Sequence, residues 1–168
     1  ERDLDSFPTW RDAELAEFGG ARVAAAGDDE VGQSLVYNEQ ERDSWEVIIV
    51  LPGVKVIPDC TFMTCKNVKT VIMSDSVRRI EGAFPSCESL EYVRLSRNLE
   101  YIGVEAFNFC ESLTSIFIPQ SCTWINDEAF AGCFKLIIFH VPQQTQLREG
   151  VISRTLLSQN CPLSGADD

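Results

Sequence analysis

The sequence contains no apolar run long enough to cross a membrane as a helix. The longest run is VIIVL at 47–51, which has the length of a strand, whereas a spanning helix needs about 20 apolar residues. The first ten residues, ERDLDSFPTW, are acidic and have no apolar core, so they do not resemble a secretory signal peptide. Because the chain begins with Glu1 rather than Met, we expect a processed, trimmed or partial chain.

Positive charge is also scarce. The 168 residues include 14 Lys and Arg against 26 Asp and Glu, which gives a net charge of −12. The imbalance is concentrated in residues 1–43, where twelve acids face four arginines. A nucleic-acid backbone or an anionic membrane surface would repel such a chain. The composition therefore favours another protein as the partner.

The residues that build catalytic and metal sites are few or wrongly spaced. His140 is the single histidine, and the chain has no G-x-S-x-G, H-E-x-x-H or phosphate-binding glycine loop. The nearest cysteine pair, Cys60 and Cys65, is wider than the C-x₂-C spacing of zinc sites, and no second pair lies at ligand spacing. We expect no catalytic residue, no metal and no cofactor, and hence no enzyme.

The sequence divides into an N-terminal extension, a periodic segment and a short tail. Hydrophobic residues make up 45%, as in a globular domain with a core. Residues 1–44 form an acidic extension without a repeat, and TWRDAELAEFGG within it predicts a short helix from the cap Thr9 to Gly19. This extension is either a solvated arm or a docking arm for a partner. Residues 45–157 are periodic, and 158–168 form a tail.

The periodic segment repeats a Phe-x-x-Cys pair every 22 or 23 residues. An isoleucine precedes each pair, and an aliphatic residue follows each Cys by three positions. Four anchors that keep one period predict a solenoid, in which each coil buries its apolar edge against its neighbours. The repeat core is expected at Ile57, Phe62, Cys65, Ile80, Phe84, Cys87, Ile102, Phe107, Cys110, Ile125, Phe130 and Cys133.

Each coil also carries two inward positions spaced by two, such as Ile116 and Ile118, which predict a short strand. The Ala-Phe spacing of the EAFxxC part is that of one helical or 3₁₀ turn. About four full coils are expected, with partial coils at both ends. Leu147–Leu157 loses the pattern and is expected to cap the last coil, because a terminal repeat needs one polar side.

The stretches VRRIEGAFPSCESLEYVRLSRN, LEYIGVEAFNFCESLTSIFIPQS and CTWINDEAFAGCFKLIIFHVPQQ resemble the BspA-like class of leucine-rich repeats, of the type abundant in diatoms and related algae. The resemblance covers about residues 45–157. It departs at the second coil, which is one residue short, and at Gly103, which has no glycine counterpart in other coils. It implies an α/β solenoid with parallel strands on the concave face, short helical or 3₁₀ turns on the convex face, and a role in protein–protein contact.

Strand positions between the inward pairs should face outward on the concave side. We name the following set the ladder residues and expect them to bind a partner: Ile49, Ile72, Tyr92, Arg94, Phe117, Ile138 and His140. Several are large and apolar, and exposed apolar patches often mark interaction sites. The alternatives are that the N-terminal extension covers them or that the fold tolerates their exposure.

The repeat cysteines are interpreted as small buried hydrophobes with free thiols, and Cys122 is expected to point inward in the same way. Cys60 should be more exposed. Free thiols favour a reducing intracellular compartment, with a processed plastid protein as an alternative. Glu105 and Glu128 lie one coil apart and are expected on a solvated convex edge rather than in a dry acid–base site.

Two functions therefore compete. The first is a non-catalytic interaction module, a rigid solenoid that presents its strand face to a protein. The second is a structural accessory subunit of a large assembly, such as one in an algal organelle. An enzyme is disfavoured because no nucleophile, base and orienting group come together.

Overall fold

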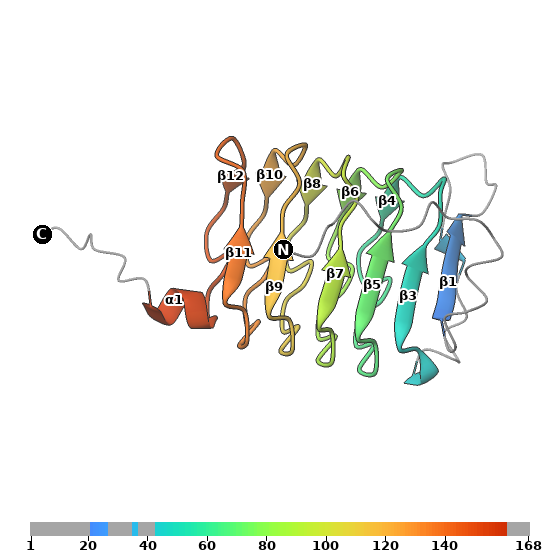
Figure 1. Cartoon of the computed structure of the whole chain (residues 1–168), viewed down its shortest axis with the longest axis horizontal. Helices are drawn as coiled ribbons and strands as arrows, with labels where there is room; N and C mark the ends of the chain where they lie inside the picture. The colour runs from blue at the N-terminus through green and yellow to red at the C-terminus, as the bar shows by residue number, and fades with distance from the viewer. Residues whose placement is uncertain (1–20, 27–34, 37–42, 161–168) are drawn as a thin grey trace, which may run out of the picture.

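The computed structural model describes residues 21–26, 35–36 and 43–160. The chain winds into a solenoid in which two rows of strands run along its length (Figure 1). The front row consists of β1 (Ala21–Ala26), β3 (Val47–Val50), β5 (Thr70–Met73), β7 (Tyr92–Arg94), β9 (Ser115–Phe117) and β11 (Ile138–His140), with β2 (Leu35–Val36) beside β1. The rear row consists of β4 (Val56–Ile57), β6 (Arg79–Ile80), β8 (Tyr101–Ile102), β10 (Trp124–Ile125) and β12 (Gln146–Leu147).

Neighbouring coils pair in parallel, which confirms the predicted parallel-strand solenoid. In the front row, β3, β5 and β7 pair at offsets of 23 and 22 residues, as in Val47↔Thr70 and Thr70↔Tyr92. The rear row forms one continuous five-stranded sheet from β4 to β12. These offsets equal the sequence period, so each coil places the same side chain above its counterpart.

The front row is interrupted once. Backbone pairing joins β2, β1, β3, β5 and β7 in one sheet and β9 with β11 in a second, while the rear sheet continues past the same point. The inward residues beside the interruption, Val93 and Leu95, keep 7% and 8% of their surface exposed. Their counterparts Ile116 and Ile118 keep only 1% and 3%. The ladder residues thus belong to two separate front sheets.

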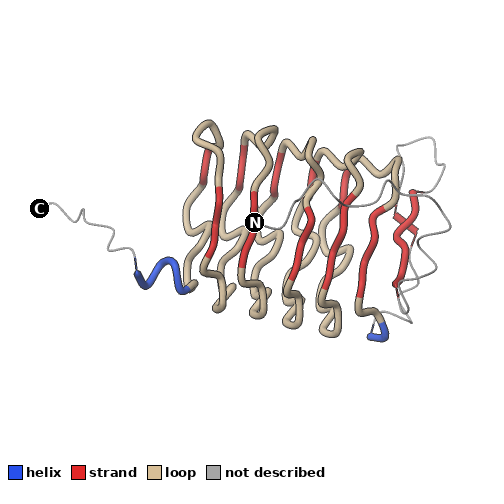
Figure 2. The backbone as a smooth tube through the Cα atoms, viewed as in Figure 1, coloured by secondary structure: helices blue, strands red, loops and turns tan. Residues whose placement is uncertain are grey.

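The helical turns expected on the convex side are not there. Within the described residues, helix is confined to α1 (Leu156–Asn160) and a 3₁₀ pair at 43–44, so most of each coil is strand and turn (Figure 2). In the third coil Glu105 and Phe109 both have a φ of +54°, and a right-handed helix cannot contain such residues. The α/β assignment is therefore wrong in its α part.

The turns are held instead by hydrogen bonds between coils. The backbone N–H of each core phenylalanine donates to a carbonyl of the next coil: Phe62 to Ala83 (2.8 Å), Phe84 to Ala106 (2.9 Å), Phe107 to Ala129 (2.8 Å) and Phe130 to Val151 (2.8 Å). A donor engaged with the next coil is unavailable for the i−4 carbonyl of its own. Inter-coil pairing therefore replaces the helix at this edge.

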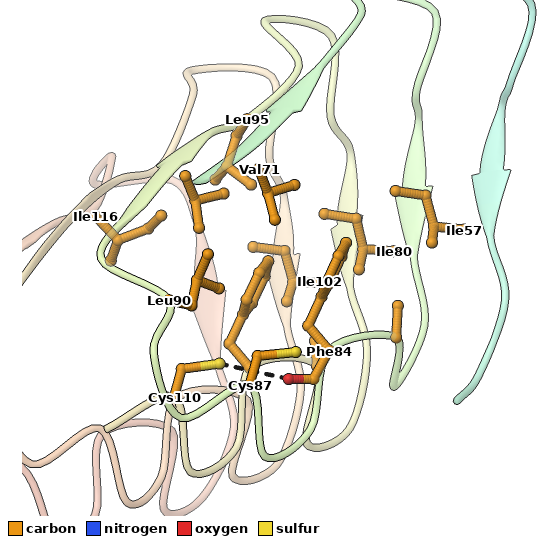
Figure 3. Close-up of a cluster of buried hydrophobic side chains, with 14 of the residues drawn as sticks. Ile57, Val71, Ile80, Phe84, Cys87, Leu90, Leu95, Ile102, Cys110 and Ile116 are labelled. Carbon is orange, nitrogen blue, oxygen red and sulfur yellow. Dashed lines mark hydrogen bonds between the residues drawn. The ribbon is translucent and has the colours of Figure 1, made fainter. Parts of the chain in front are cut away.

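The core runs between the two rows as columns of identical side chains. The rings of Phe62, Phe84, Phe107 and Phe130 stack at centroid distances of 5.0–5.2 Å with interplanar angles of 4–17°. Isoleucine and cysteine columns run beside them (Figure 3). All twelve residues assigned to the repeat core are fully buried, as is Cys122.

Part of the N-terminal segment joins the solenoid. Strand β1 pairs in parallel with β3 through four residue pairs, from Ala21↔Val47 to Ala24↔Val50. The helix expected between Thr9 and Gly19 lies outside the described residues, and the boundary near residue 44 stays a prediction. No helix in the described part of the chain is long and apolar enough to span a membrane.

Candidate protein-binding face

The ladder residues line up across the front strands in the predicted register. Ile49 pairs with Ile72 and Ile72 with Arg94, while beyond the interruption Phe117 pairs with His140. A second outward row pairs Thr70 with Tyr92 and Ser115 with Ile138. Strand pairing therefore brings residues that are 22 or 23 positions apart onto one face.

Two ladder residues do not lie on an exposed surface. Ile49 and Ile72 are only 2% and 5% exposed, so the expectation that the whole row is open is wrong at this end. Each lies on a strand that is paired on both sides. The Arg94 side chain turns toward β5, where its Nη1 donates a 2.5 Å hydrogen bond to the carbonyl of Met73.

Arg94 is held in that position by an acidic residue in the loop after β5. Its guanidinium lies 3.7 Å from the Asp75 carboxylate, which also contacts the Arg97 side chain at 3.3 Å and accepts a 3.0 Å hydrogen bond from the Arg97 backbone N–H. The Arg94 side chain is only 14% exposed. The positive charge of Arg94 is therefore paired with Asp75 in the loop, and little of it is exposed on the strand face.

The exposed part of the face lies at its C-terminal end. Phe117 and Ile138 keep 52% and 47% of their surface in solvent, Tyr92 keeps 37%, and His140 is exposed. The rings of Phe117 and His140 lie 6.2 Å apart. We call Tyr92, Phe117, Ile138 and His140 the open ladder.

Ile137 belongs beside this cluster and was not predicted. It is 55% exposed and immediately precedes β11. The same coil position holds Lys69, Glu91 and Thr114 in earlier coils. The sequence does contain a signal for Ile137: isoleucine replaces the polar residues of earlier coils at a position outside the inward columns.

The rear sheet carries a second row of large side chains that sequence reasoning missed. The Arg79 guanidinium lies 4.0 Å from the centre of the Tyr101 ring, and Arg148 lies 4.9 Å from that of Trp124. Arg79 also binds Glu81 through two hydrogen bonds. These cation–π contacts cover ring faces, so the row is explained by contacts within the chain.

The repeated cysteines have a structural explanation. The thiols of Cys87, Cys110 and Cys133 each donate to the carbonyl of a core phenylalanine in the preceding coil, at 3.2–3.4 Å; Figure 3 shows the bond from Cys110 to Phe84. Cys87, Cys110, Cys122 and Cys133 are buried free thiols, Cys65 is buried, and Cys60 is an exposed free thiol. The seventh cysteine, Cys161, lies outside the described residues.

Their surroundings suppress thiolate chemistry. A hydrogen bond with the Cys110 thiol, together with burial, raises the pKa of Cys87 well above its usual value. Burial raises the pKa of Cys133 to about 12 and that of Cys122 to about 11. The thiolate is the reactive form of cysteine, so these side chains act as core filling.

No metal-binding group of three or more His, Cys, Asp and Glu side chains occurs within residues 43–160. Glu105 and Glu128 are exposed on the turn edge, as expected for solvated carboxylates.

Residues 40–157 match the family model described as "BspA type Leucine rich repeat region", with six copies. The chain belongs to the BspA-type leucine-rich-repeat family. The resemblance found in the sequence is confirmed. Leucine-rich repeats of this kind generally mediate protein–protein contact and are typically non-catalytic scaffolds.

Solved structures of bacterial leucine-rich-repeat proteins share this fold. A leucine-rich cell-surface protein from Faecalibacterium prausnitzii is 34% identical with a TM-score of 0.62, over 65% of this chain and 29% of that one. A Treponema pallidum leucine-rich-repeat protein is 26% identical with a TM-score of 0.60, over 63% of this chain and 53% of that one. This BspA-type chain therefore spans about half or less of these relatives. No curated protein matches it.

Proposed function

We propose that this BspA-type chain binds a partner protein through the open ladder. The observation that supports the proposal is the exposure of Phe117 and Ile138 on two paired strands, directly beside His140. Large apolar side chains on a rigid sheet contribute most to binding when a partner removes them from water. Ile49 and Ile72 are left out of the contact surface because they are already buried.

The side chains of the open ladder favour an apolar contact at the centre of the interface. No carboxylate lies in β9 or β11, and the nearest fixed charge on the ladder, Arg94, is engaged by Asp75. The net charge of −12 resides elsewhere in the chain. An apolar centre suits a partner that brings apolar side chains of its own to the contact.

A photocrosslinking experiment tests the proposal. Benzophenone-phenylalanine is placed at Phe117 in one variant and at Val56, an exposed residue on rear strand β4, in a matched control. In native extract the Phe117 probe should capture a defined protein that excess unlabelled wild-type chain displaces, whereas the Val56 probe should not. Equal capture by both probes, or capture that the Phe117→Ala competitor displaces as well as wild type, would contradict it.

The accessory-subunit hypothesis concerns the same contact in a permanent assembly. Size-exclusion chromatography of native extract separates the two versions. A stable subunit would elute entirely at high mass, whereas a transient interaction module would elute in part as the free chain.

A further inference from the structure

The interruption of the front row lies inside the repeats, between β7 and β9 (Figure 1). At the other junctions of the repeats, two consecutive backbone N–H groups donate to one carbonyl of the preceding coil at 2.8–3.2 Å: Lys69 and Thr70 to Glu46, Glu91 and Tyr92 to Lys69, and Ile137 and Ile138 to Thr114. The counterparts Thr114 and Ser115 make no such bond to the Glu91 carbonyl. We call this unbonded boundary between β7 and β9 the seam.

A third bond is missing at the other end of the same strands. The Ile118 N–H donates to the His140 carbonyl at 2.9 Å, but the equivalent bond from the Leu95 N–H to the Phe117 carbonyl is absent. Cα atoms of β7 and β9 nevertheless approach within 8 Å of each other. That is too close to admit another strand, which would need about 4.8 Å on each side. The seam is therefore a widened gap between two neighbouring strands.

The other sides of the same coils stay bonded. On the rear, β6, β8 and β10 pair in one sheet, and the Gly103 N–H donates to the Ile80 carbonyl at 2.7 Å. At the turn, the Ser86 N–H donates to the Asn108 carbonyl at 2.7 Å. The rings of Phe84 and Phe107 stack at 5.1 Å, as closely as the other rings in their column. The coils are thus joined at the rear and at the turn and unbonded only at the front.

The free energy gained by closing the seam is small. Backbone groups that water satisfies gain little net free energy when they pair with each other instead. Closing would also bury the remaining exposed surface of Val93 and Leu95, which is only 7% and 8% of each residue. An open and a closed position of the seam therefore have similar free energies, whereas separation at the rear would break an intact sheet.

The seam divides the open ladder into two parts. Tyr92 lies on β7, whereas Phe117, Ile138 and His140 lie beyond the seam on β9 and β11. A change in the width of the seam alters the distance from Tyr92 to Phe117. It leaves the distance from Phe117 to His140 unchanged, because their strands are paired. A partner that contacts both parts would select one width.

We propose that the front of the solenoid opens and closes at the seam, with the rear sheet as the hinge, and that this motion adjusts the spacing between Tyr92 and the rest of the open ladder. The structure has the open position. In the closed position the Thr114 and Ser115 N–H groups donate to Glu91. The use of the motion in binding rests on the proposed function, but the motion belongs to the free chain. A test on the free chain therefore separates failure of the hinge from failure of the proposed binding.

Spin-label pairs in the full chain test the motion by EPR distance measurement. The background carries Cys60→Ser and Cys161→Ser, and the same background without added cysteines measures any labelling of the buried thiols. Each pair joins two exposed positions that lie two coils apart: Glu91→Cys with Ile137→Cys across the seam at the front, Glu46→Cys with Glu91→Cys at the front without crossing it, and Arg78→Cys with Thr123→Cys across the seam at the rear.

The pair that crosses the seam at the front should have a distance distribution about twofold wider than either of the other pairs, because hinge motion moves only its two ends apart. Equal widths in all three pairs would overturn the proposal. A longer but equally narrow distance at the front would also overturn it, since the gap would then be fixed. A rear pair as broad as the front pair would mean that the coils separate on every side, which contradicts a rear hinge.

Amide hydrogen exchange tests whether the bonds are missing in solution. After correction for intrinsic rates, the N–H groups of Thr114 and Ser115 should exchange about tenfold faster than those of Ile137 and Ile138, which occupy the same coil positions and are bonded. Glu91 and Tyr92 provide a second bonded reference one coil earlier. Equal protection at all three junctions would show that the front row is continuous in solution, and the proposal would then be wrong.

Discussion

The His140 ring lies 6.2 Å from the Phe117 ring, centroid to centroid, on strands that pair residue for residue. The two residues are 23 positions apart in sequence, one coil of the solenoid. Both side chains are exposed, although the same strands bury Ile116 and part of Phe139 on the opposite side. Alternation along the strand thus separates packing residues from contact residues within three positions.

The stacked phenylalanines should dominate stability. Phe107→Ala removes a fully buried ring that stacks on Phe84 and Phe130, and we expect a loss of about 3–5 kcal/mol in the free energy of unfolding. Urea denaturation measures the loss. Phe117→Ala is the matched control and should change stability by less than ~1 kcal/mol, because the ring is exposed. Similar losses in both variants would contradict the assignment of Phe107 to the core.

The buried thiols should make stability depend on alkaline pH. Burial raises the pKa of Cys122 to about 11 in the folded chain, whereas an unfolded thiol titrates near 8.5. Above that pH the unfolded state loses its proton first, so stability is fully present below pH ~8.5 and falls as pH rises toward 11.

Cys122→Val isolates this thiol, because Val77 occupies the equivalent position in an earlier coil. Replacing the thiol should reduce the alkaline slope by up to about 1.4 kcal/mol per pH unit. Chemical denaturation at pH 7, 9 and 10 provides the measurement. A slope equal to that of wild type would show that the Cys122 thiol ionises freely in the folded chain.

Gly132 should resist substitution for two reasons. Its φ is +72°, and an added Cβ would lie 2.7 Å from a ring carbon of Phe109. We expect Gly132→Ala to cost about 1–2 kcal/mol. In the double variant with Phe109→Ala the clash disappears and only the backbone strain remains, so the two losses should add to more than the double-variant loss. Simple additivity in a double-mutant cycle would rule out the clash.

Deletion of the terminal coil should expose the core. Truncation after Pro142 removes β12 and the Val151 carbonyl that accepts from the Phe130 N–H. We expect a lower melting temperature and increased binding of a hydrophobic dye. An unchanged melting temperature would mean that residues 143–168 do not cap the solenoid.

The repeat core was predictable because the same residue recurs at the same coil position. Stacking of the coils places each copy against the copy in the preceding coil. The column of Phe62, Phe84, Phe107 and Phe130 could therefore be predicted without knowing the path of the chain between them. Register followed from the same period. The pairing of Phe117 with His140 is one instance.

The turn geometry was not predictable in the same way. The Ala106–Phe107 spacing resembles a helical turn, but the backbone donors there bond to the next coil and Glu105 has a positive φ. Glutamate gives no sign of that conformation, which glycine would have given. Strand β1 was missed as well, because ARVAAA is rich in alanine, which has little preference for strands.

The sequence by itself determined the period, the core columns, the family and the set of residues that could face outward, because stacking repeats one local pattern. Only the tertiary structure decided which outward residues remain in solvent. Ile72 and Phe117 occupy the same ladder position, yet one is 5% and the other 52% exposed. Exposure depends on what packs over the face from other parts of the chain, and the pattern within a single coil carries no information about that packing.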